Sequence, residues 1–273
     1  MQEHLNRARL SGKKIGFVPT MGALHEGHLA LLDVCKSNSD LSVCSIFVNP
    51  TQFNDPKDFQ KYPVTLEKDI YLLEKRKTDI LFLPSKDEIY PNGTASLRHY
   101  DLGYLETLLE GKYRPGHFQG VCQVMERLLM TVAPDDLFMG QKDYQQCMVV
   151  KRLLKIMQSS ITFHACDTVR EPDGLAMSSR NTRLNELDRK KALAIYQTLL
   201  YLKQNLKPGD LFPLMMNANS MLAANGFKVD YVEIADAESL EPVANWNGCQ
   251  PLIALIAAFI HEVRLIDNML LVE

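Results

Sequence analysis

Two histidines three residues apart are the feature of the sequence best suited to chemistry on a phosphate. His25 and His28 end the run Pro-Thr-Met-Gly-Ala-Leu-His-Glu-Gly-His. The run follows a short apolar segment, 14–19, and precedes a segment with helical periodicity, so we expect it to join a buried strand to the N-terminus of a helix. Two imidazoles on one helical turn share a face. Beside the unpaired N–H groups of a helix end, they could stabilise charge that develops on the α-phosphate of a nucleotide.

Two other interpretations of this pair stay open on the tetrapeptide alone. His-x-x-His can hold zinc, although a third ligand is not obvious in the sequence. The pair could also be purely structural. The turn formed by Thr20, Met21 and Gly22 favours phosphate binding, because a glycine lets the backbone approach an anion closely.

Polar residues also follow the other predicted strands. Asn49 and Gln52 come directly after the segment 41–48 and could read hydroxyl and carboxylate groups, although Asn-Pro is equally typical of a turn. Arg114 and His117 lie in a Gly- and Pro-rich loop that could close over phosphates or be an ordinary exposed loop.

A fourth stretch follows the predicted strand 136–139. Gly140 permits close approach to a ligand, and Lys142 supplies a point charge for a phosphate. Asp143 could accept a hydrogen bond from a ribose hydroxyl or simply cap the next helix, and Gln146 would face the same crevice one turn later.

A fifth stretch contains Ser178, Ser179 and Arg180. Two hydroxyls and a guanidinium close together suit a triphosphate tail. Ser-Ser-Arg alone occurs often by chance, so its weight comes from following four other polar loops.

The elements that must position these loops alternate regularly along the chain. Strands are predicted at 14–19, 41–48, 80–83, 136–139 and 161–166, and helices at 28–36, 64–77, 118–133 and 143–157. This α/β alternation predicts a parallel sheet covered by helices on both faces. After about residue 168, helices at 185–206 and 211–225 and strands at 229–235 and 252–260 predict a smaller α+β unit, so we expect domains at 1–168 and 169–273.

Composition excludes several classes of function. The 30 basic and 33 acidic residues give a net charge of −3, which offers no bulk attraction for nucleic acid or an anionic membrane. None of the six cysteines form a Cys-x-x-Cys pair, so we expect reduced thiols, several of them buried. The longest apolar run, 251–260, is too short to span a bilayer, and the N-terminus lacks the apolar region of a signal peptide. A cytoplasmic protein is expected.

Taken together, the five stretches closely resemble the pantothenate synthetase (pantoate–β-alanine ligase) family, within the superfamily of nucleotidyl transferases and class I aminoacyl-tRNA synthetases. Their signatures are intact and in order, including Phe-Val-Asn-Pro-Thr-Gln-Phe, Arg-Pro-Gly-His-Phe-Gln-Gly-Val, Gly-Gln-Lys-Asp-Tyr and Asp-Gly-Leu-Ala-Met-Ser-Ser-Arg-Asn. The resemblance implies a Rossmann-like domain that binds ATP and pantoate, followed by a C-terminal lid domain. It also implies a two-step reaction, in which pantoate and ATP form pantoyl adenylate and pyrophosphate, and β-alanine then attacks the adenylate to give pantothenate and AMP. By the same resemblance, Mg²⁺ would accompany ATP and the protein would be a homodimer.

The resemblance also assigns residues. The catalytic group would be His28, as proton donor, with His25, Lys142 and Arg180. The ATP site would comprise Met21, Gly22, Ala23, Leu24, His25, Glu26, Gly27, His28, Gly140, Gln141, Lys142, Asp143, Val169, Met177, Ser178, Ser179 and Arg180. Gln52, Gln146 and Asn49 would bind pantoate, Gln52 would also bind β-alanine, and Asp69 would lie near magnesium.

One departure and two rivals accompany this interpretation. Family members often carry more residues before the first strand, but that part precedes every quoted motif. The first rival is a related nucleotidyl transferase that moves AMP or CMP onto a phosphate ester, and the second is a non-catalytic nucleotide-binding protein. The intact His-x-Gly-His motif, Lys142 and the Ser-Ser-Arg loop favour the ligase.

Overall fold

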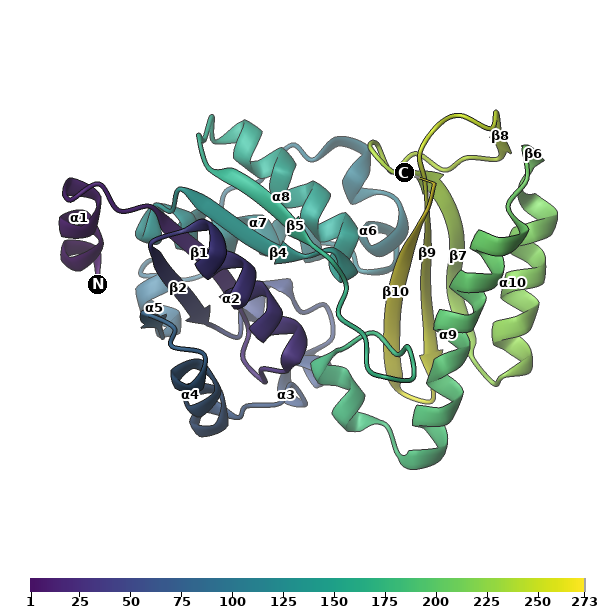
Figure 1. Ribbon diagram of the computed structural model, residues 1–273, viewed down its shortest axis with the longest axis horizontal. Helices are drawn as coiled ribbons and strands as arrows, with labels where there is room; N and C mark the ends of the chain where they lie inside the picture. Colours follow the sequence, from purple (N-terminus) through teal and green to yellow (C-terminus); the bar gives the residue numbers. More distant parts are fainter. Residues whose placement is uncertain (273) are drawn as a thin grey trace. The chain divides into compact units, whose positions relative to one another are not determined.

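The computed structural model describes residues 1–272, apart from the side chain of Lys57 (Figure 1). The chain divides into two compact units, Met1–Thr168 and Val169–Glu273.

The first unit is built on a five-stranded parallel sheet. Its strands are β1 (Ile15–Thr20), β2 (Leu41–Ile46), β3 (Ile80–Phe82), β4 (Asp136–Gly140) and β5 (Thr162–Cys166), in the order β3-β2-β1-β4-β5. The central strands are almost continuously buried, as expected of a sheet covered on both faces. The predicted fold class is therefore confirmed.

The main helices follow from the strand order. They are α2 (Glu26–Asn38), α4 (Leu66–Lys75), α7 (His117–Val132) and α8 (Tyr144–Ile156). The chain moves from β1 through β2 to β3 and then returns to the other side of β1. Because parallel crossovers are right-handed, this reversal places α2 and α4 on one face and α7 and α8 on the other. In Figure 1, α2 crosses in front of the strands and α7 lies behind them.

Several short elements complete the first unit and were not predicted. They are α1 (Gln2–Leu10), α3 (Pro56–Gln60), α5 (Lys86–Ile89), α6 (Leu109–Tyr113) and the 3-10 turns η1 (Pro50–Gln52), η2 (Gly103–Glu106) and η3 (Gln141–Asp143). Most span less than two helical turns, too few for a hydrophobic period to be recognised in a sequence.

Strands β1 and β4 form the point at which the strand order reverses. Their ladder has only two residue pairs, Gly16 with Asp136 and Phe17 with Leu137, whereas the ladder of β1 with β2 has six pairs and continues to Thr20. The carboxyl ends of β1 and β4 are therefore not laddered to each other. In doubly wound folds, this is the crevice where ligands bind.

The second unit is antiparallel. Strands β7 (Lys228–Asp236), β9 (Leu252–Ile260) and β10 (Val263–Val272) form a sheet in the order β10-β9-β7, and β6 (Gly209–Asp210) pairs with β8 (Asn245–Trp246). Helices α9 (Glu186–Asn205) and α10 (Phe212–Ala224) contribute to its apolar core, and η4 (Ser179–Arg183) precedes them.

Strand β10 was not predicted, because charged residues interrupt its apolar pattern. Two of these charges have partners inside the unit: Arg264 Nε donates to Asp230 Oδ2 at 2.7 Å, and Asp267 accepts from Arg170. Paired charges can be buried in a sheet, but the pairing is invisible in the sequence.

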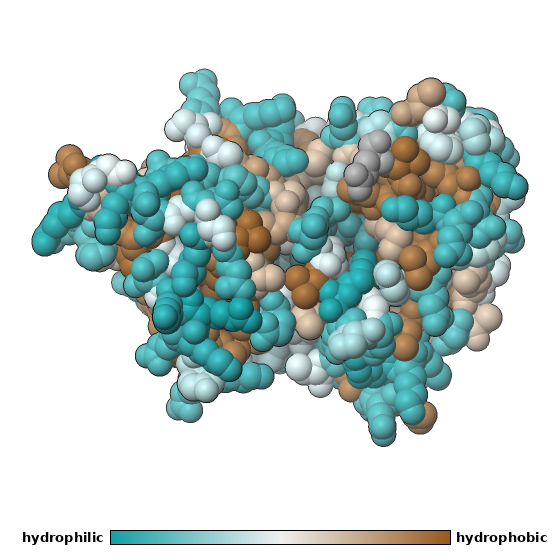
Figure 2. Space-filling view, in the orientation of Figure 1, coloured by the Kyte–Doolittle hydropathy of each residue, from teal (hydrophilic) through white to brown (hydrophobic). Residues whose placement is uncertain are grey.

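The surface and the thiols agree with a globular protein. Figure 2 shows a largely hydrophilic face on which hydrophobic side chains form separate patches. All six cysteines are free, and Cys35, Cys44, Cys122 and Cys147 are buried, as expected for several of them. Among residues 1–272, no helix is long and apolar enough to cross a membrane.

Candidate active site

The loop between β1 and α2 is held in place by a carboxylate from α4. Asp69 is 1% exposed, and its two oxygens accept hydrogen bonds from the N–H groups of Ala23 at 2.9 Å and Leu24 at 2.8 Å. Gly22 has φ +81°, and a Cβ there would lie 3.0 Å from the Ile46 side chain and 3.1 Å from Asp69 Oδ2. The glycine therefore allows a tight turn, and Asp69 fixes the turn that leads into the histidine pair.

The same contacts bear on the expected magnesium site. Asp69 Oδ1 also accepts from Thr65 Oγ1 at 3.0 Å, so protein donors already surround this carboxylate. Within residues 1–272, no group of three or more His, Cys, Asp or Glu side chains is arranged to hold a metal ion. These residues do not fit a magnesium ion held by the protein alone. Magnesium near Asp69 stays a prediction.

The rings of His25 and His28 lie against each other at the N-terminus of α2, tilted by 36°. Their ring centroids are 4.0 Å apart, and the backbone N–H of His25 donates to His28 Nδ1 at 3.3 Å. Because Nδ1 of His28 accepts this bond, the proton of its neutral ring is on Nε2.

Both rings are neutral at physiological pH. Burial and, to a smaller extent, the nearby positive charge of Lys142 lower the pKa of His25 to about 4. Burial lowers the pKa of His28 to about 3, and the electrostatic effects of His25 and Lys142 act in the same direction. Nδ1 of His25 is buried and has no hydrogen-bond partner among the described residues, although the His25 side chain faces the backbone N–H of His28 as in a capping box. The histidine pair therefore also caps the start of α2.

Lys142 reaches this pair from the other side of the switch point. It lies in η3, immediately after β4, with its Nζ 3.9 Å from Asp143 Oδ1. A Cβ on Gly140 would meet no atom within 4 Å, so the start of this turn is open to a ligand. The structure therefore brings together the first and fourth predicted stretches.

The two glutamines that follow have different surroundings. Gln145 is 2% exposed, and its amide bonds to the backbone at Leu105, Leu108 and Glu110. Gln146 is only half-buried. A structural role thus falls to Gln145, which leaves Gln146 as the candidate for substrate.

Gln52 ends the turn η1 and points at the histidine loop. It is 9% exposed, and its Nε2 donates to Met21 Sδ at 3.1 Å. Asn49 is 1% exposed, and its Nδ2 donates to Gln52 Oε1 and to the backbone oxygen of Gly120, both at 3.1 Å. Asn49 therefore contacts Gln52. Its predicted contact with pantoate is untested.

The third stretch supports Gln52 from the side of α7. His117 Nδ1 lies 2.7 Å from the backbone oxygen of Gln52, and Arg114 Nη1 lies 3.1 Å from His117 Nε2. Since the guanidinium can only donate, His117 Nε2 accepts and Nδ1 donates to Gln52. A Cβ on Gly120 would come within 2.2 Å of the Thr51 oxygen, so only glycine lets α7 pack on this turn.

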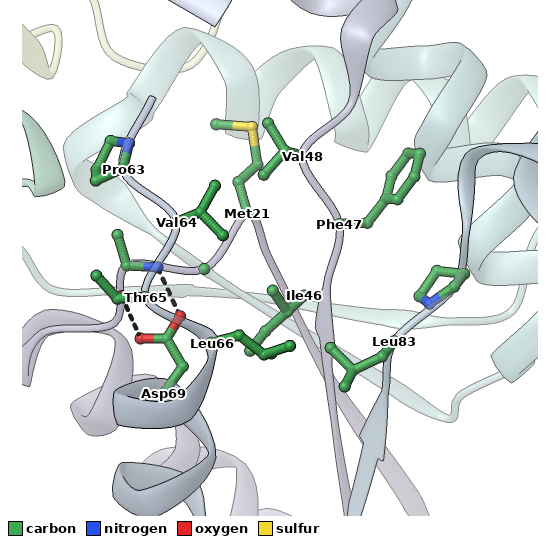
Figure 3. Close-up of a pocket in the computed structure, with 13 residues that line it drawn as sticks. Met21, Ile46, Phe47, Val48, Pro63, Val64, Thr65, Leu66, Asp69 and Leu83 are labelled. Atoms are coloured by element: carbon green, nitrogen blue, oxygen red, sulfur yellow. Dashed lines mark hydrogen bonds between the residues drawn. The ribbon is translucent and has the colours of Figure 1, made fainter. Parts of the chain in front are cut away.

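A pocket of about 240 Å³ adjoins the histidine loop on the side of α4. Figure 3 shows its largely hydrophobic walls, with Met21 and Val48 at the top and Asp69 at the lower left, hydrogen-bonded to the loop above it. Its lining does not include either histidine, Gln52 or Lys142. The pocket is therefore distinct from the polar groups of the candidate site.

The remaining predicted residues belong to the second unit. Met177 N–H donates to the oxygen of Val169 at 3.0 Å, and Ser178 Oγ accepts from the N–H of Arg180 at 3.2 Å. The start of the loop 169–183 is fixed, because the guanidinium of Arg170 donates to both carboxylate oxygens of Asp267, at 2.6 and 3.1 Å. The part of Val169, Met177, Ser178, Ser179 and Arg180 in the nucleotide site stays a prediction.

The fold and the first unit's site define a class: a doubly wound α/β protein that presents neutral imidazoles and a lysine at its switch point, as nucleotide-binding enzymes do. The family model for pantoate-beta-alanine ligase matches residues 1–270. The chain belongs to this family of enzymes.

Individual relatives agree along the whole chain. A pantothenate synthetase of Leptospira interrogans is 42% identical over 276 residues, covering 99% of this chain and 96% of the relative. That of Bacteroides fragilis is 40% identical over 269 residues, covering 98% and 95%. The crystal structure of pantothenate synthetase from Thermus thermophilus is similar with a TM-score of 0.88 and 38% identity, covering 98% of each chain. Pantoate-beta-alanine ligase from Francisella tularensis, complexed with beta-gamma ATP and beta-alanine, gives a TM-score of 0.81 and 39% identity over 98% of this chain and 95% of that one.

Proposed function

We propose that this protein joins (R)-pantoate to β-alanine at the expense of ATP, giving pantothenate, AMP and pyrophosphate. The Francisella relative was crystallised with an ATP compound and beta-alanine, and the family name supplies the acid. The observation that carries the proposal is the neutral pair His25 and His28, at the N-terminus of α2 and close enough to Lys142 for its charge to lower both pKa values.

The chemistry needs two displacements. A carboxylate oxygen of pantoate attacks the α-phosphorus of ATP and pyrophosphate leaves, which forms pantoyl adenylate. The amine of β-alanine then attacks the acyl carbon, and AMP leaves with the electron pair of the C–O bond while the amine loses a proton. Neither step uses a protein nucleophile, so the site mainly positions reactants and stabilises charge.

Each group in the first unit has a place in this scheme. The Nε2–H of His28 can donate to a phosphate oxygen, and Lys142 adds positive charge as negative charge grows. A neutral imidazole donates without attracting the attacking carboxylate away from its target. The amide of Gln52 would hold the acid, with Gln146 assisting.

Other properties of the proposal rest on the family resemblance. Magnesium would enter bound to ATP, as part of the substrate. The Ser178–Arg180 segment would bind the triphosphate tail. The protein would act as a cytoplasmic homodimer.

An assay with ATP, pantoate and β-alanine, omitting one component at a time, tests the function. We expect AMP and pyrophosphate only when pantoate is present, and pantothenate only when all three are present. The variant His28→Ala tests the role of the histidine. It should slow pantoate-dependent exchange of pyrophosphate into ATP by about a hundredfold or more while leaving the far-UV circular dichroism unchanged.

Three outcomes would contradict the proposal. ADP as the main product would indicate an acyl-phosphate ligase. Transfer of AMP to a phosphate ester, with no use of pantoate, would indicate a nucleotidyl transferase. Near-normal exchange in His28→Ala would remove the histidine from the chemistry.

A further inference from the structure

Tyr90 lies behind the Gln52 turn and has no role in the proposed chemistry. It follows α5, is 2% exposed, and donates from its hydroxyl to Asn49 Oδ1 at 2.8 Å. Burial raises the pKa of this hydroxyl above its ordinary value of 10, so it remains a hydrogen-bond donor throughout the physiological range. The guanidinium of Arg127 lies 5.0 Å from the ring centre and holds the ring from the other side.

The bond from Tyr90 is the shortest of those that hold the Asn49 amide, and through it the Gln52 amide, in one orientation. An asparagine amide can turn over, exchanging its acceptor oxygen for its donor nitrogen. The Tyr90 hydroxyl and the N–H and Oγ1 of Thr51 donate to Asn49 Oδ1. On the other side, Asn49 Nδ2 donates to the oxygen of Gly120, and this arrangement keeps Nδ2 on the side of Gln52. Asn49 Nδ2 then donates to Gln52 Oε1, which leaves Gln52 Nε2 facing Met21 on the histidine loop.

We infer that Tyr90 is a positioning residue: through Asn49, it sets the Gln52 amide so that Gln52 presents its N–H donors, and not its carbonyl oxygen, to the acid substrate. The inference rests on the proposed function, since it concerns how the same site selects a carboxylate or hydroxyl oxygen. A turned Gln52 would place an acceptor against an anionic acid, which repels the substrate and leaves the amide unpaired.

Tyr90→Phe removes only the hydroxyl and leaves the ring. Tyr100→Phe is a closely matched control, because Tyr100 is 1% exposed, its hydroxyl donates to Glu126 Oε2 at 2.6 Å, and Arg98 lies 5.1 Å from its ring. Among the described residues, the side-chain hydrogen bonds of Tyr100 and Glu126 join them to Arg98, Gln119 and each other, and not to the Gln52 turn. Both variants thus lose the hydroxyl of a buried tyrosine whose ring lies beside an arginine.

We expect Tyr90→Phe to raise the KM for pantoate by about three- to tenfold, the effect of losing one orienting hydrogen bond, with the KM for ATP within twofold of wild type. Tyr100→Phe should change neither constant, although both variants should lose comparable thermal stability. The inference fails if the two variants show the same kinetic change, or if Tyr90→Phe affects pantoate and ATP equally. An inactive wild-type protein would contradict the proposed function instead.

A second measurement separates positioning from general loosening of the fold. In ¹⁵N spectra without substrate, the side-chain NH₂ signals of Gln52, identified by their loss in Gln52→Ala, should shift in Tyr90→Phe and remain in place in Tyr100→Phe. Unchanged Gln52 signals in Tyr90→Phe would overturn the inference. In a double-mutant cycle, Tyr90→Phe should have no further effect on pantoate affinity once Gln52→Ala is present, and additive effects would count against it.

Discussion

The histidine pair of the candidate site is built to be uncharged. The folded-state pKa values of His25 and His28, about 4 and about 3, lie below the ordinary value of 6.5 because the rings are buried. Activity between about pH 5.5 and pH 8 should therefore not follow a histidine titration at these positions. The consequence for stability has a definite sign. Above pH 6.5 both states carry neutral rings, and as the pH falls from 6.5 toward 4, only the unfolded chain takes up protons, so folding stability is lost.

This difference predicts how a substitution changes the pH dependence of stability. His28→Gln should lose less stability than the wild type when the pH is lowered from about 7.5 to about 5, because one of the two proton-binding groups of the unfolded chain is gone. The measurement is urea unfolding of both proteins at the two pH values. Equal losses in both proteins would show that His28 does not titrate as its burial requires.

Sequence reasoning singled out candidate residues by side-chain types that carry chemistry. The spacing of His25 and His28 and the lysine after a strand indicated a phosphate site, and the structure brings these groups together. The residues that orient them gave no such signal. Asp69 lies 46 and 45 positions from the two N–H groups it accepts from, and Tyr90 bonds to a turn 41 positions away. Such supporting contacts depend on tertiary packing, which a single sequence does not reveal.

At the scale of elements, substitution by alanine should have different effects on stability at two glycines near the site. Alanine at Gly120, inside α7, would improve helix propensity but would press on the Thr51 oxygen, so Gly120→Ala should destabilise the fold by about 1–3 kcal/mol and weaken pantoate binding. Gly140→Ala meets no atom within 4 Å and should change stability by less than about 0.5 kcal/mol while raising the KM for ATP. Thermal unfolding and steady-state kinetics of both variants check this. A stable Gly120→Ala, or a Gly140→Ala with unaltered ATP kinetics, would contradict it.

The longer elements could be predicted because their hydrophobic periods are long and regular. Helices α7, α8 and α9 and strands β1, β2 and β9 all lie within two residues of their expected bounds. The missed strand β10 carries Arg264 and Asp267, whose charges break the period, and each is neutralised by a residue from a distant part of the second unit. Pairing of this kind decides the structure only after folding has brought the partners together.

At the scale of the whole molecule, the second unit contains a loop whose residues are predicted to bind nucleotide. The loop 169–183 of the second unit depends on the buried pair Arg170–Asp267. Removing one partner of a buried pair leaves the other charge uncompensated, so Asp267→Asn should destabilise the second unit by about 3 kcal/mol. Trp246 is the one tryptophan of the sequence and lies in this unit, so its fluorescence reports the change directly.

A control variant shows whether the loop or only the stability matters. Asp230→Asn breaks a similarly buried pair, with Arg264, in the same sheet, and leaves the pair of Arg170 with Asp267 in place. Both variants should lower the fluorescence midpoint, whereas only Asp267→Asn should raise the KM for ATP measured well below that midpoint. If the two variants affect ATP alike, the pair has no specific connection with nucleotide binding.

The short ladder between β1 and β4 has one further consequence. Beyond the pairs of Gly16 and Phe17, these strands are not joined by ladder hydrogen bonds at their carboxyl ends. A substrate that enters there does not have to separate paired backbone, and the groups that meet it are already fixed by Asp69 and Asn49. The reorganisation that binding would otherwise require is completed when the chain folds, so the free energy of substrate contacts remains available for the transition state.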